Sequence, residues 1–191
     1  MTSPAAKKAM RDATRAIRAK LAVSQPGAAE ALVGTFPESV LAAGGTAAGY
    51  FPLGDELSPL LLMQALAAHG WQTSLPVMRS DERGLDFHAW RPGDPLEEKR
   101  FGVQEPAAHT PGIDPFLILV PALAVDLQGG RLGYGQGYYD RALSWRAKQG
   151  PVFACGVAYD DQVLLNVPRD PWDFPLNAIL TPTRFILISD E

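Results

Sequence analysis

The apolar run FLILVP, residues 116–121, constrains the fold of this chain more than any other segment. Together with its neighbours it forms PFLILVPALAV, which is too short to cross a bilayer and contains two prolines. A strand without alternating polar residues is typical of a position covered on both faces, as in the middle of a parallel sheet. The run therefore favours an α/β domain with a largely parallel sheet.

Helical and strand-like segments alternate along the rest of the chain, as an α/β fold requires. In the second half, YYDRALSWRAKQ predicts a helix over 138–149 that Gly150 ends. Ser58 is the expected N-cap of an earlier helix, with Pro59 at its first position and Gly70 after its end. Further helices are expected at residues 5–22 and 28–33, and strands at 46–51, 71–77, 85–90, 152–159, 177–180 and 184–189. The pattern has no linker or repeat, so we expect a single domain over 1–191.

Composition is that of an ordinary globular protein, with 47% hydrophobic and 20% charged residues in 191. The single cysteine, Cys155, lies in the apolar run PVFACGVAY and cannot form an internal disulfide. We interpret it as a core side chain of a protein from a reducing compartment. With no apolar signal segment at the N-terminus, we expect a soluble, cytoplasmic and monomeric protein that binds no membrane.

Charge is concentrated in the first helix. Residues 1–20 carry six basic and one acidic side chain, a balance of +5, so the remainder carries −9 of the total of −4. A local anion partner is favoured over a general nucleic-acid surface, because the latter needs a basic face over the whole domain. Met10, Ile17 and Leu21 form an expected apolar stripe. Beside it, Lys7 and Arg11 lie four residues apart and can reach one phosphate, although a solvated basic face is the alternative.

The stretch GGRLGYGQGYYDRAL, residues 129–143, sets five glycines within nine residues. Gly129 and Gly130 fit a hairpin turn, because both are able to supply positive φ at its tip. Gly133, Gly135 and Gly137 precede a helix start, where exposed N–H groups and the helix dipole attract anions. The alternative is a tight strand–helix junction without a ligand. The spacing matches neither G-x-G-x-x-G nor the P-loop.

Two carboxylates stand beside these candidate anion sites. Asp140 lies in the first turn of the helix after the glycines, where it either complements the helix dipole or binds Mg²⁺. Glu56 follows the strand TAAGYF, and ligands bind at the carboxyl ends of such strands. The alternative is that Glu56 is only a helix-start acid. The three histidines show no metal-ligand spacing.

Several of these segments, in order, resemble the 5-formyltetrahydrofolate cyclo-ligase family. The resemblance is carried by KKAMR, YFPLGDEL, FGVQEP, LVPALAVDLQGGRLGYGQGYYDRAL, GVAYDDQ and WDFPLNAILTPTR, with RLGYGQGYYDR the most specific part. It implies a three-layer α/β/α fold with a mainly parallel sheet, like that of the NagB/RpiA/CoA-transferase group. It also implies the reaction of 5-formyltetrahydrofolate with ATP to give 5,10-methenyltetrahydrofolate, ADP and phosphate, with Mg²⁺ as cofactor.

The resemblance assigns roles residue by residue. It implies that ATP binds to Lys7, Arg11, Arg131, Leu132, Gly133, Tyr134, Gly135, Gln136, Gly137, Tyr138 and Tyr139. The folate substrate is expected at Phe51, Glu56, Tyr134, Gly135, Gln136, Gly137 and Tyr138, and the metal at Asp140 and Asn177. Gln136 stands where the family commonly has glycine or a basic residue. Asn177 stands where an aspartate is often found, and Asp173 is the alternative ligand.

Two other functions compete with this interpretation. A sugar-phosphate isomerase or transferase would use the glycine cradle for a phosphoester without ATP, but the second basic site on the first helix favours a polyphosphate. A catalytically silent nucleotide- or RNA-binding relative is disfavoured by the net acidity and the intact RLGYGQGYYDR segment. Since the reaction needs charge neutralisation and positioning, no covalent nucleophile is expected.

Overall fold

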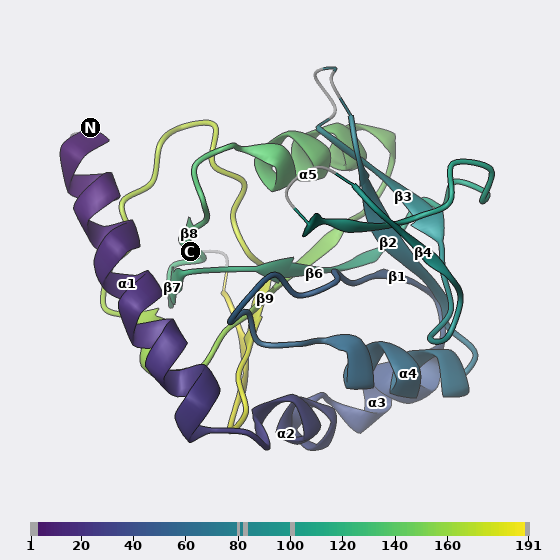
Figure 1. The fold of residues 1–191 in the computed structure, drawn as a ribbon, viewed down its shortest axis with the longest axis horizontal. Coiled ribbons are helices and arrows are strands. Elements are labelled where there is room, and N and C mark those ends of the chain that lie inside the picture. The colour runs from purple at the N-terminus through teal and green to yellow at the C-terminus, as the bar shows by residue number, and fades with distance from the viewer. Residues whose placement is uncertain (1–3, 80, 82–83, 100–101, 190–191) are drawn as a thin grey trace.

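The computed structural model describes residues 4–79, 81, 84–99 and 102–189 and is built around a mainly parallel sheet (Figure 1). In the described residues this sheet has seven strands, in the order β12-β11-β9-β6-β1-β2-β3. The central strands are parallel, and β3 and β12 are antiparallel at the two edges. The strands are β1 (Thr46–Ala48), β2 (Gln72–Met78), β3 (Leu85–Ala89), β6 (Leu117–Pro121), β9 (Phe153–Val157), β11 (Ala178–Leu180) and β12 (Phe185–Leu187).

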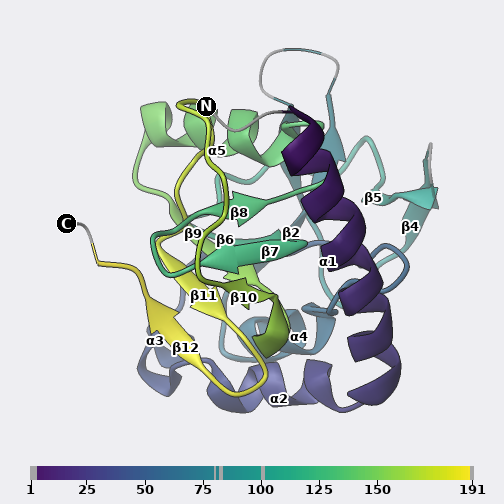
Figure 2. The same ribbon diagram turned by 90° about the vertical axis from the view of Figure 1, so that its left-hand side faces the viewer.

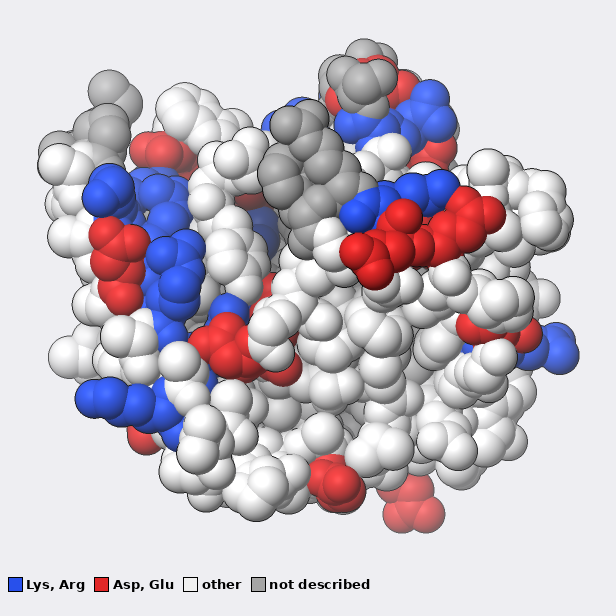
Figure 3. All heavy atoms as spheres, in the orientation of Figure 1, with Lys and Arg blue, Asp and Glu red and all other residues white. Residues whose placement is uncertain are grey.

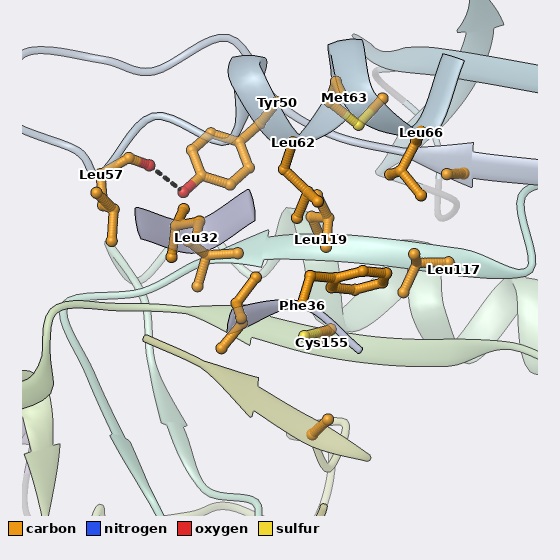
Figure 4. Packing of buried hydrophobic residues seen from close by; sticks show 14 of the residues in the cluster. Leu32, Phe36, Tyr50, Leu57, Leu62, Met63, Leu66, Leu117, Leu119 and Cys155 are labelled. Carbon is orange, nitrogen blue, oxygen red and sulfur yellow. Dashed lines mark hydrogen bonds between the residues drawn. The ribbon is translucent and has the colours of Figure 1, made fainter. Parts of the chain in front are cut away.

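Helices cover both faces of this sheet, which confirms the predicted three-layer arrangement (Figure 1). Successive side chains of a strand point to opposite faces, so Leu117 and Leu119 join one buried cluster and Ile118 and Val120 the other. The first cluster lies beneath α2 (Ala28–Thr35), α3 (Glu38–Ala43) and α4 (Leu60–Ala68), and Figure 4 shows part of it. The second packs against α5 (Tyr138–Gln149). Residues 117–120 of the run FLILVP are thus buried from both sides, as its composition predicts, whereas Phe116 is exposed.

A long first helix, α1 (Pro4–Ser24), lies along the side of the molecule beside a small second sheet (Figure 2). This sheet has the order β10-β7-β8 and consists of β7 (Ala124–Asp126), β8 (Arg131–Leu132) and β10 (Val163–Leu164). Met10 of α1 packs on its apolar side chains, and α1 also contacts the 3₁₀ turn η2 (Asp160–Gln162). A separate hairpin joins β4 (Leu96–Glu98) to β5 (Gln104–Pro106).

The face that α1 buries differs from the expected one. Ile17 is 40% exposed, whereas Arg18 is only 2% exposed and lies with Thr14 and Leu21 on the inner side. The stripe Met10–Ile17–Leu21 was therefore wrong at its middle position. The cause is electrostatic: Asp55 and Tyr134 provide oxygen partners for the Arg18 guanidinium, which makes a buried arginine tolerable at this position.

Other boundaries shift by a few residues. Helix α4 begins at Leu60 instead of Pro59, although the Leu60 N–H still donates to Ser58 Oγ at 3.3 Å. Strand β1 ends at Ala48, before the GYF of the predicted strand. Over the described ranges, no helix is long and apolar enough to span a membrane. The single-domain, monomeric and cytoplasmic assignments stay predictions.

Candidate active site

A cavity of about 660 Å³ opens where the strand order of the main sheet reverses. From β1 the chain continues to β2 on one side, whereas β6 lies on the other side of β1. The segments that leave β1 and β6 diverge here, and open α/β sheets bind ligands at such a point. Tyr50 and Phe51 after β1 and Pro121 at the end of β6 line the cavity. In the space-filling view the centre of the molecule is hollowed beside the basic side chains of α1 (Figure 3).

The structure brings all but one of the expected site residues to this cavity. Every residue of 131–139 contributes to its wall, and α1, the segment after β1 and α5 add the rest. The lining includes Lys7, Arg11, Phe51, Glu56, Arg131, Leu132, Gly133, Tyr134, Gly135, Gln136, Gly137, Tyr138, Tyr139 and Asp140. Asn177 is not part of the lining.

Helix α1 brings two cations to the wall. Lys7 Nζ donates to Asp170 Oδ2 at 2.7 Å and to Asp173 Oδ2 at 3.2 Å. Burial alone would lower the pKa of Lys7, but these two carboxylates raise it above 10.5, so the side chain stays charged. Arg11 Nε donates to the Gly133 carbonyl at 2.9 Å. Lys7 and Arg11, the basic face of α1, are therefore turned toward the body of the protein, where Arg11 contacts the glycine segment, residues 131–137.

The glycine segment approaches the start of α5 through two left-handed residues. Gly135 has φ of 94° and Gly137 has φ of 65°, conformations that glycine adopts without steric cost. Gly137 is the N-cap of α5 and provides no side-chain hydrogen bond to the helix. A Cβ at Gly135 would come within 3.1 Å of the Arg11 guanidinium, and one at Gly137 within 3.2 Å of Arg141 Nη1. Backbone and guanidinium groups thus lie closely packed at this wall.

The neighbouring turn between β7 and β8 is a hairpin, as predicted, but only one of its glycines has positive φ. Gly129 has φ of 78°, whereas Gly130 does not enter the left-handed region, so only Gly129 supplies positive φ to the turn. Close packing explains that glycine: a Cβ there would lie 2.5 Å from Asp126 Oδ2. The buried Asp126 carboxylate accepts N–H groups from Gly130 at 2.7 Å, Gln128 at 3.0 Å and Val167 at 2.6 Å.

An arginine–aspartate pair joins the glycine segment to α5. Arg131 Nη2 donates to Asp140 Oδ1 at 2.7 Å, and both side chains line the cavity. Asp140 Oδ1 also accepts the Phe174 N–H at 3.3 Å, which places the 170–174 loop beside α5. Arg131 Nε is buried without a hydrogen-bond partner among the residues that the structure describes. A buried donor of this kind, next to a cavity, suits an anionic ligand.

Glu56 is the buried carboxylate of the cavity, with a side chain that is 5% exposed. Its Oε2 accepts the Leu53 N–H at 2.9 Å. Burial raises the pKa of Glu56, while the Leu53 N–H, the Tyr134 hydroxyl and the Arg18 guanidinium oppose this rise. Tyr50 lies beside it, and its hydroxyl donates to the Leu57 carbonyl at 2.6 Å (Figure 4). The loop after β1 is thereby held in a fixed shape at the cavity.

Comparison with known proteins agrees with this geometry. A model of the 5-formyltetrahydrofolate cyclo-ligase family matches residues 4–182. The chain belongs to this family. The 5-formyltetrahydrofolate cyclo-ligase of Mycolicibacterium smegmatis is 39% identical over 170 residues, which cover 84% of this chain and 85% of that protein. The Escherichia coli K12 protein of the same name is 33% identical over 157 residues, covering 78% and 84%.

The cyclo-ligase fold is also found among solved structures. The NMR structure of Aquifex aeolicus 5,10-methenyltetrahydrofolate synthetase matches with a TM-score of 0.77 at 27% identity, over 97% of this chain and 94% of that one. The similarity between this structure and the present one confirms the mixed α/β fold with a large, mainly parallel sheet. The likeness to the NagB/RpiA/CoA-transferase group stays a prediction.

Gln136 and Asn177, where this chain departs from the expected family pattern, both take part in hydrogen bonds within the protein. Gln136 is exposed, and its carbonyl accepts a hydrogen bond from Arg141 Nη1 at 2.9 Å. Asn177 Oδ1 accepts the Ala154 N–H at 2.8 Å, within the main sheet. Its role as a metal ligand stays a prediction, and the sequence alternative Asp173 does line the cavity. Cys155 is buried, which raises the pKa of its thiol to about 12 and leaves it a core side chain.

Sequence reasoning missed three residues that line the cavity or lie beside it. Asp170 lines the cavity and pairs with Lys7, and Tyr50, after β1, lines it as well. Arg18 pairs with Asp55 and donates to the hydroxyl of Tyr134, which lines the cavity. For Arg18 a signal existed, because it follows Lys7 and Arg11 at helical spacing on one face. For Asp170, in the stretch RDPWDF, no periodic pattern marks the position.

Proposed function

We propose that this protein converts 5-formyltetrahydrofolate to 5,10-methenyltetrahydrofolate with consumption of ATP and in the presence of Mg²⁺. One observation supports this most strongly: the basic face of α1, the glycine segment and the buried Glu56 all border the same cavity. Cations and N–H groups suit a polyphosphate, while a buried carboxylate suits the N–H groups of a reduced pterin. Membership of the cyclo-ligase family supports the pairing of these two substrates.

The reaction proceeds in two balanced steps. The formyl oxygen attacks the γ-phosphorus of ATP, so that an O–P bond forms and the bond to ADP breaks, which gives an imino-phosphate. N10 then attacks the activated carbon, phosphate leaves with the former formyl oxygen, and the N10 proton is lost as the ring closes. The phosphorylation is necessary because the formyl oxygen by itself is a poor leaving group. No covalent enzyme nucleophile takes part.

The protein contributes positioning and charge neutralisation. Lys7, Arg11 and Arg131 face the phosphates, and the unpartnered Arg131 Nε offers one of them a donor. The start of α5 lines the same cavity, and Gly137 gives its first N–H groups no side-chain cap, so they can donate to a phosphate. Phe51 and Glu56 hold the pterin, with Glu56 accepting two of its N–H groups.

The donors available for magnesium are carboxylate oxygens, which Mg²⁺ prefers. Asp140, Asp170 and Asp173 all line the cavity, and Asp140 reaches the 170–174 loop through the Phe174 N–H. Within the described ranges no cluster of three or more His, Cys, Asp or Glu side chains forms a preassembled metal site. Since Mg²⁺ usually keeps several waters and binds through one or two carboxylates plus substrate phosphates, these donors still fit it. We propose Asp140 and Asp173 as its protein ligands, and the ion neutralises phosphate charge when bound.

An absorbance assay tests the function directly. Purified protein is mixed with 5-formyltetrahydrofolate, and methenyltetrahydrofolate is followed by its near-ultraviolet absorbance with and without ATP and Mg²⁺. We expect product only when both are present, with one ADP formed per product. Product formation without ATP, or none with stereochemically pure or polyglutamylated substrate, would overturn the proposal.

Glu56→Gln provides the matching residue test. We expect it to raise the KM for 5-formyltetrahydrofolate more than the KM for ATP, because it removes an acceptor for the pterin. Equal effects on both substrates would instead indicate a structural role after β1.

A further inference from the structure

Arg18 is the most deeply buried cation near the cavity and the only residue of α1 that contacts both Asp55 and Tyr134 among the described side chains. It does not line the cavity itself. A charge that is 2% exposed is costly unless other groups compensate it. The surroundings of Arg18 therefore call for an explanation beyond helix packing.

Asp55 and Tyr134 supply most of that compensation. Asp55 Oδ1 accepts from Arg18 Nε at 3.1 Å and from Nη2 at 2.5 Å. Nη2 also donates to the Tyr134 hydroxyl oxygen at 2.6 Å, and the guanidinium lies 5.5 Å from the centre of the Tyr134 ring. Tyr134 belongs to the glycine segment, so Arg18 connects α1 both to this segment and to the loop after β1.

The third neighbour is Glu56. Arg18 Nη1 lies 3.8 Å from Glu56 Oε1, which is close enough for charge attraction but too long for a hydrogen bond. Nη1 has no hydrogen-bond partner among the described residues. Arg18 thus compensates the charge of Glu56 without occupying Oε1 as an acceptor. That oxygen keeps its capacity to accept a donor from a ligand in the cavity.

From this geometry we infer that Arg18 is a positioning residue for the folate substrate, acting through Glu56 and Tyr134. The inference rests on the proposed function and adds a specific residue to it. The positive charge of Arg18 attracts the buried Glu56 carboxylate and favours its charged form, and Arg18 Nη2 holds the hydroxyl of Tyr134, whose side chain lines the same cavity. Lys7 lies about three turns and Arg11 about two turns nearer the N-terminus of α1. Lys7 contacts the 170–174 loop, and Arg11 contacts the glycine segment at Gly133. One helix therefore serves both substrates with different arginine and lysine side chains.

The first test is Arg18→Met, which keeps a long apolar stem and removes the charge. We expect the KM for 5-formyltetrahydrofolate to rise about tenfold or more, because a charge-assisted interaction is lost. The KM for ATP should stay within about twofold of the unmodified protein. Equal increases in both KM values would overturn the inference.

Arg146→Met is a matched control. Arg146 is also a mostly buried arginine, with a side chain that is 11% exposed and an Asp114 partner at 3.1 Å. It lies on α5 and does not line the cavity. We expect Arg146→Met to lower thermal stability while both KM values stay unchanged. If it changed the folate KM as much as Arg18→Met does, loss of a buried arginine in general would explain the effect, and the inference would fail.

A double-mutant cycle decides whether Arg18 acts through Glu56. In the Glu56→Gln background, Arg18→Met should raise the folate KM by only about twofold, because the carboxylate that it supports is already gone. Fully additive effects would show that the two residues act independently and would overturn the inference. Activity of the unmodified protein is measured first, so that absence of ATP-dependent product overturns the proposed function and is not confused with this result.

Should Arg18→Met fail to fold, Arg18→Lys answers the same question. Lysine retains the charge but loses the planar fork that binds Asp55 and Tyr134 together. We expect a smaller rise in folate KM, about three- to fivefold, again absent in the Glu56→Gln background. A folded Arg18→Lys protein with an unchanged folate KM, or with an increase that persists beside Glu56→Gln, would overturn the inference.

Discussion

Two glycine-rich regions lie next to each other in this chain and use glycine for different reasons. In the turn at Gly129–Gly130, an added Cβ would meet rigid groups: the Leu176 carbonyl at 2.8 Å or the Asp126 carboxylate at 2.5 Å. In the loop at Gly135 and Gly137, it would meet only the ends of arginine side chains, at 3.1 and 3.2 Å. The turn is packed by the protein itself, whereas the loop borders a cavity. Similar glycine density is therefore explained by internal packing in the turn, and in the loop we propose that it allows a ligand to approach.

The largest effect should come from Asp126→Ala. Three backbone N–H groups lose their acceptor, two of them in buried hydrogen bonds. Each buried loss costs about 1–3 kcal/mol, so we expect the free energy of unfolding to fall by about 3 kcal/mol or more. Urea denaturation measures this change, and ATP titration of the folded protein should give a nearly normal Kd. Asp94→Ala is the control, since Asp94 is exposed and its carboxylate accepts one N–H, from Arg91. A loss no greater than that of Asp94→Ala would contradict this account of the turn.

Gly130→Ala should lower stability by about 1–3 kcal/mol, because its methyl group would overlap the Asp126 carboxylate. The ATP Kd of the folded protein should not change. In the Asp126→Ala background the same substitution should cost much less, because the obstructing atoms are gone. Urea denaturation of the two single variants and the double variant tests this, and equal costs in both backgrounds would rule out the steric explanation.

Gly135→Ala is expected to act mainly on the nucleotide. Its positive φ makes alanine unfavourable by about 1 kcal/mol. The methyl group would also press on the Arg11 guanidinium at the wall of the cavity, and we expect the ATP Kd to rise about tenfold. Calorimetric titration with ATP and a thermal melt separate the two effects. A variant that lost stability but bound ATP normally would reduce this loop to a tight turn like its neighbour.

Much of the fold follows from local sequence patterns. The run FLILVP became β6 and YYDRALSWRAKQ became α5, with Gly150 at its end as predicted. Both depend on strong local signals, an unbroken apolar run and a helix with a glycine stop. The hairpin at Gly129 was equally clear, but Gly130 was not, because its constraint is the distant side-chain position of Asp126 rather than its own φ.

The residues that meet at the cavity were largely predictable from the sequence, but their contacts were less so. The lysine and arginine of α1, the glycine segment and Glu56 meet at one cavity as expected. Periodicity assigned Ile17 to the interior, but Arg18 is buried there instead. Hydrophobicity alone does not reveal that Asp55 and Tyr134, on the facing segments, provide hydrogen-bond partners for this arginine. Similarly, the partners of Lys7 come from residues 170–173, more than 160 positions away, and no local pattern specifies such a contact.

The smallest expected effect is on stability and comes from Lys7, which holds α1 against the 170–173 loop through its charge rather than through packing. Lys7 is held by Asp170 and Asp173, and these carboxylates raise its pKa above 10.5 despite the opposing effect of burial. Because the folded pKa is the higher one, the stabilising contribution is fully present below about pH 10.5 and is lost as pH rises through the folded value. At pH 7–9, Lys7→Met should therefore lower the free energy of unfolding by about 0.5–1 kcal/mol, and the difference from the unmodified protein should shrink at higher pH.

Urea denaturation of both proteins between pH 7 and 11 measures this difference. Lys8→Met serves as control, because Lys8 is 79% exposed and its pairing with Asp12 at 3.4 Å should contribute almost nothing. A gap between Lys7→Met and the unmodified protein that stayed constant across this pH range would show that the stem of Lys7, not its charge, fastens α1 to the 170–173 loop.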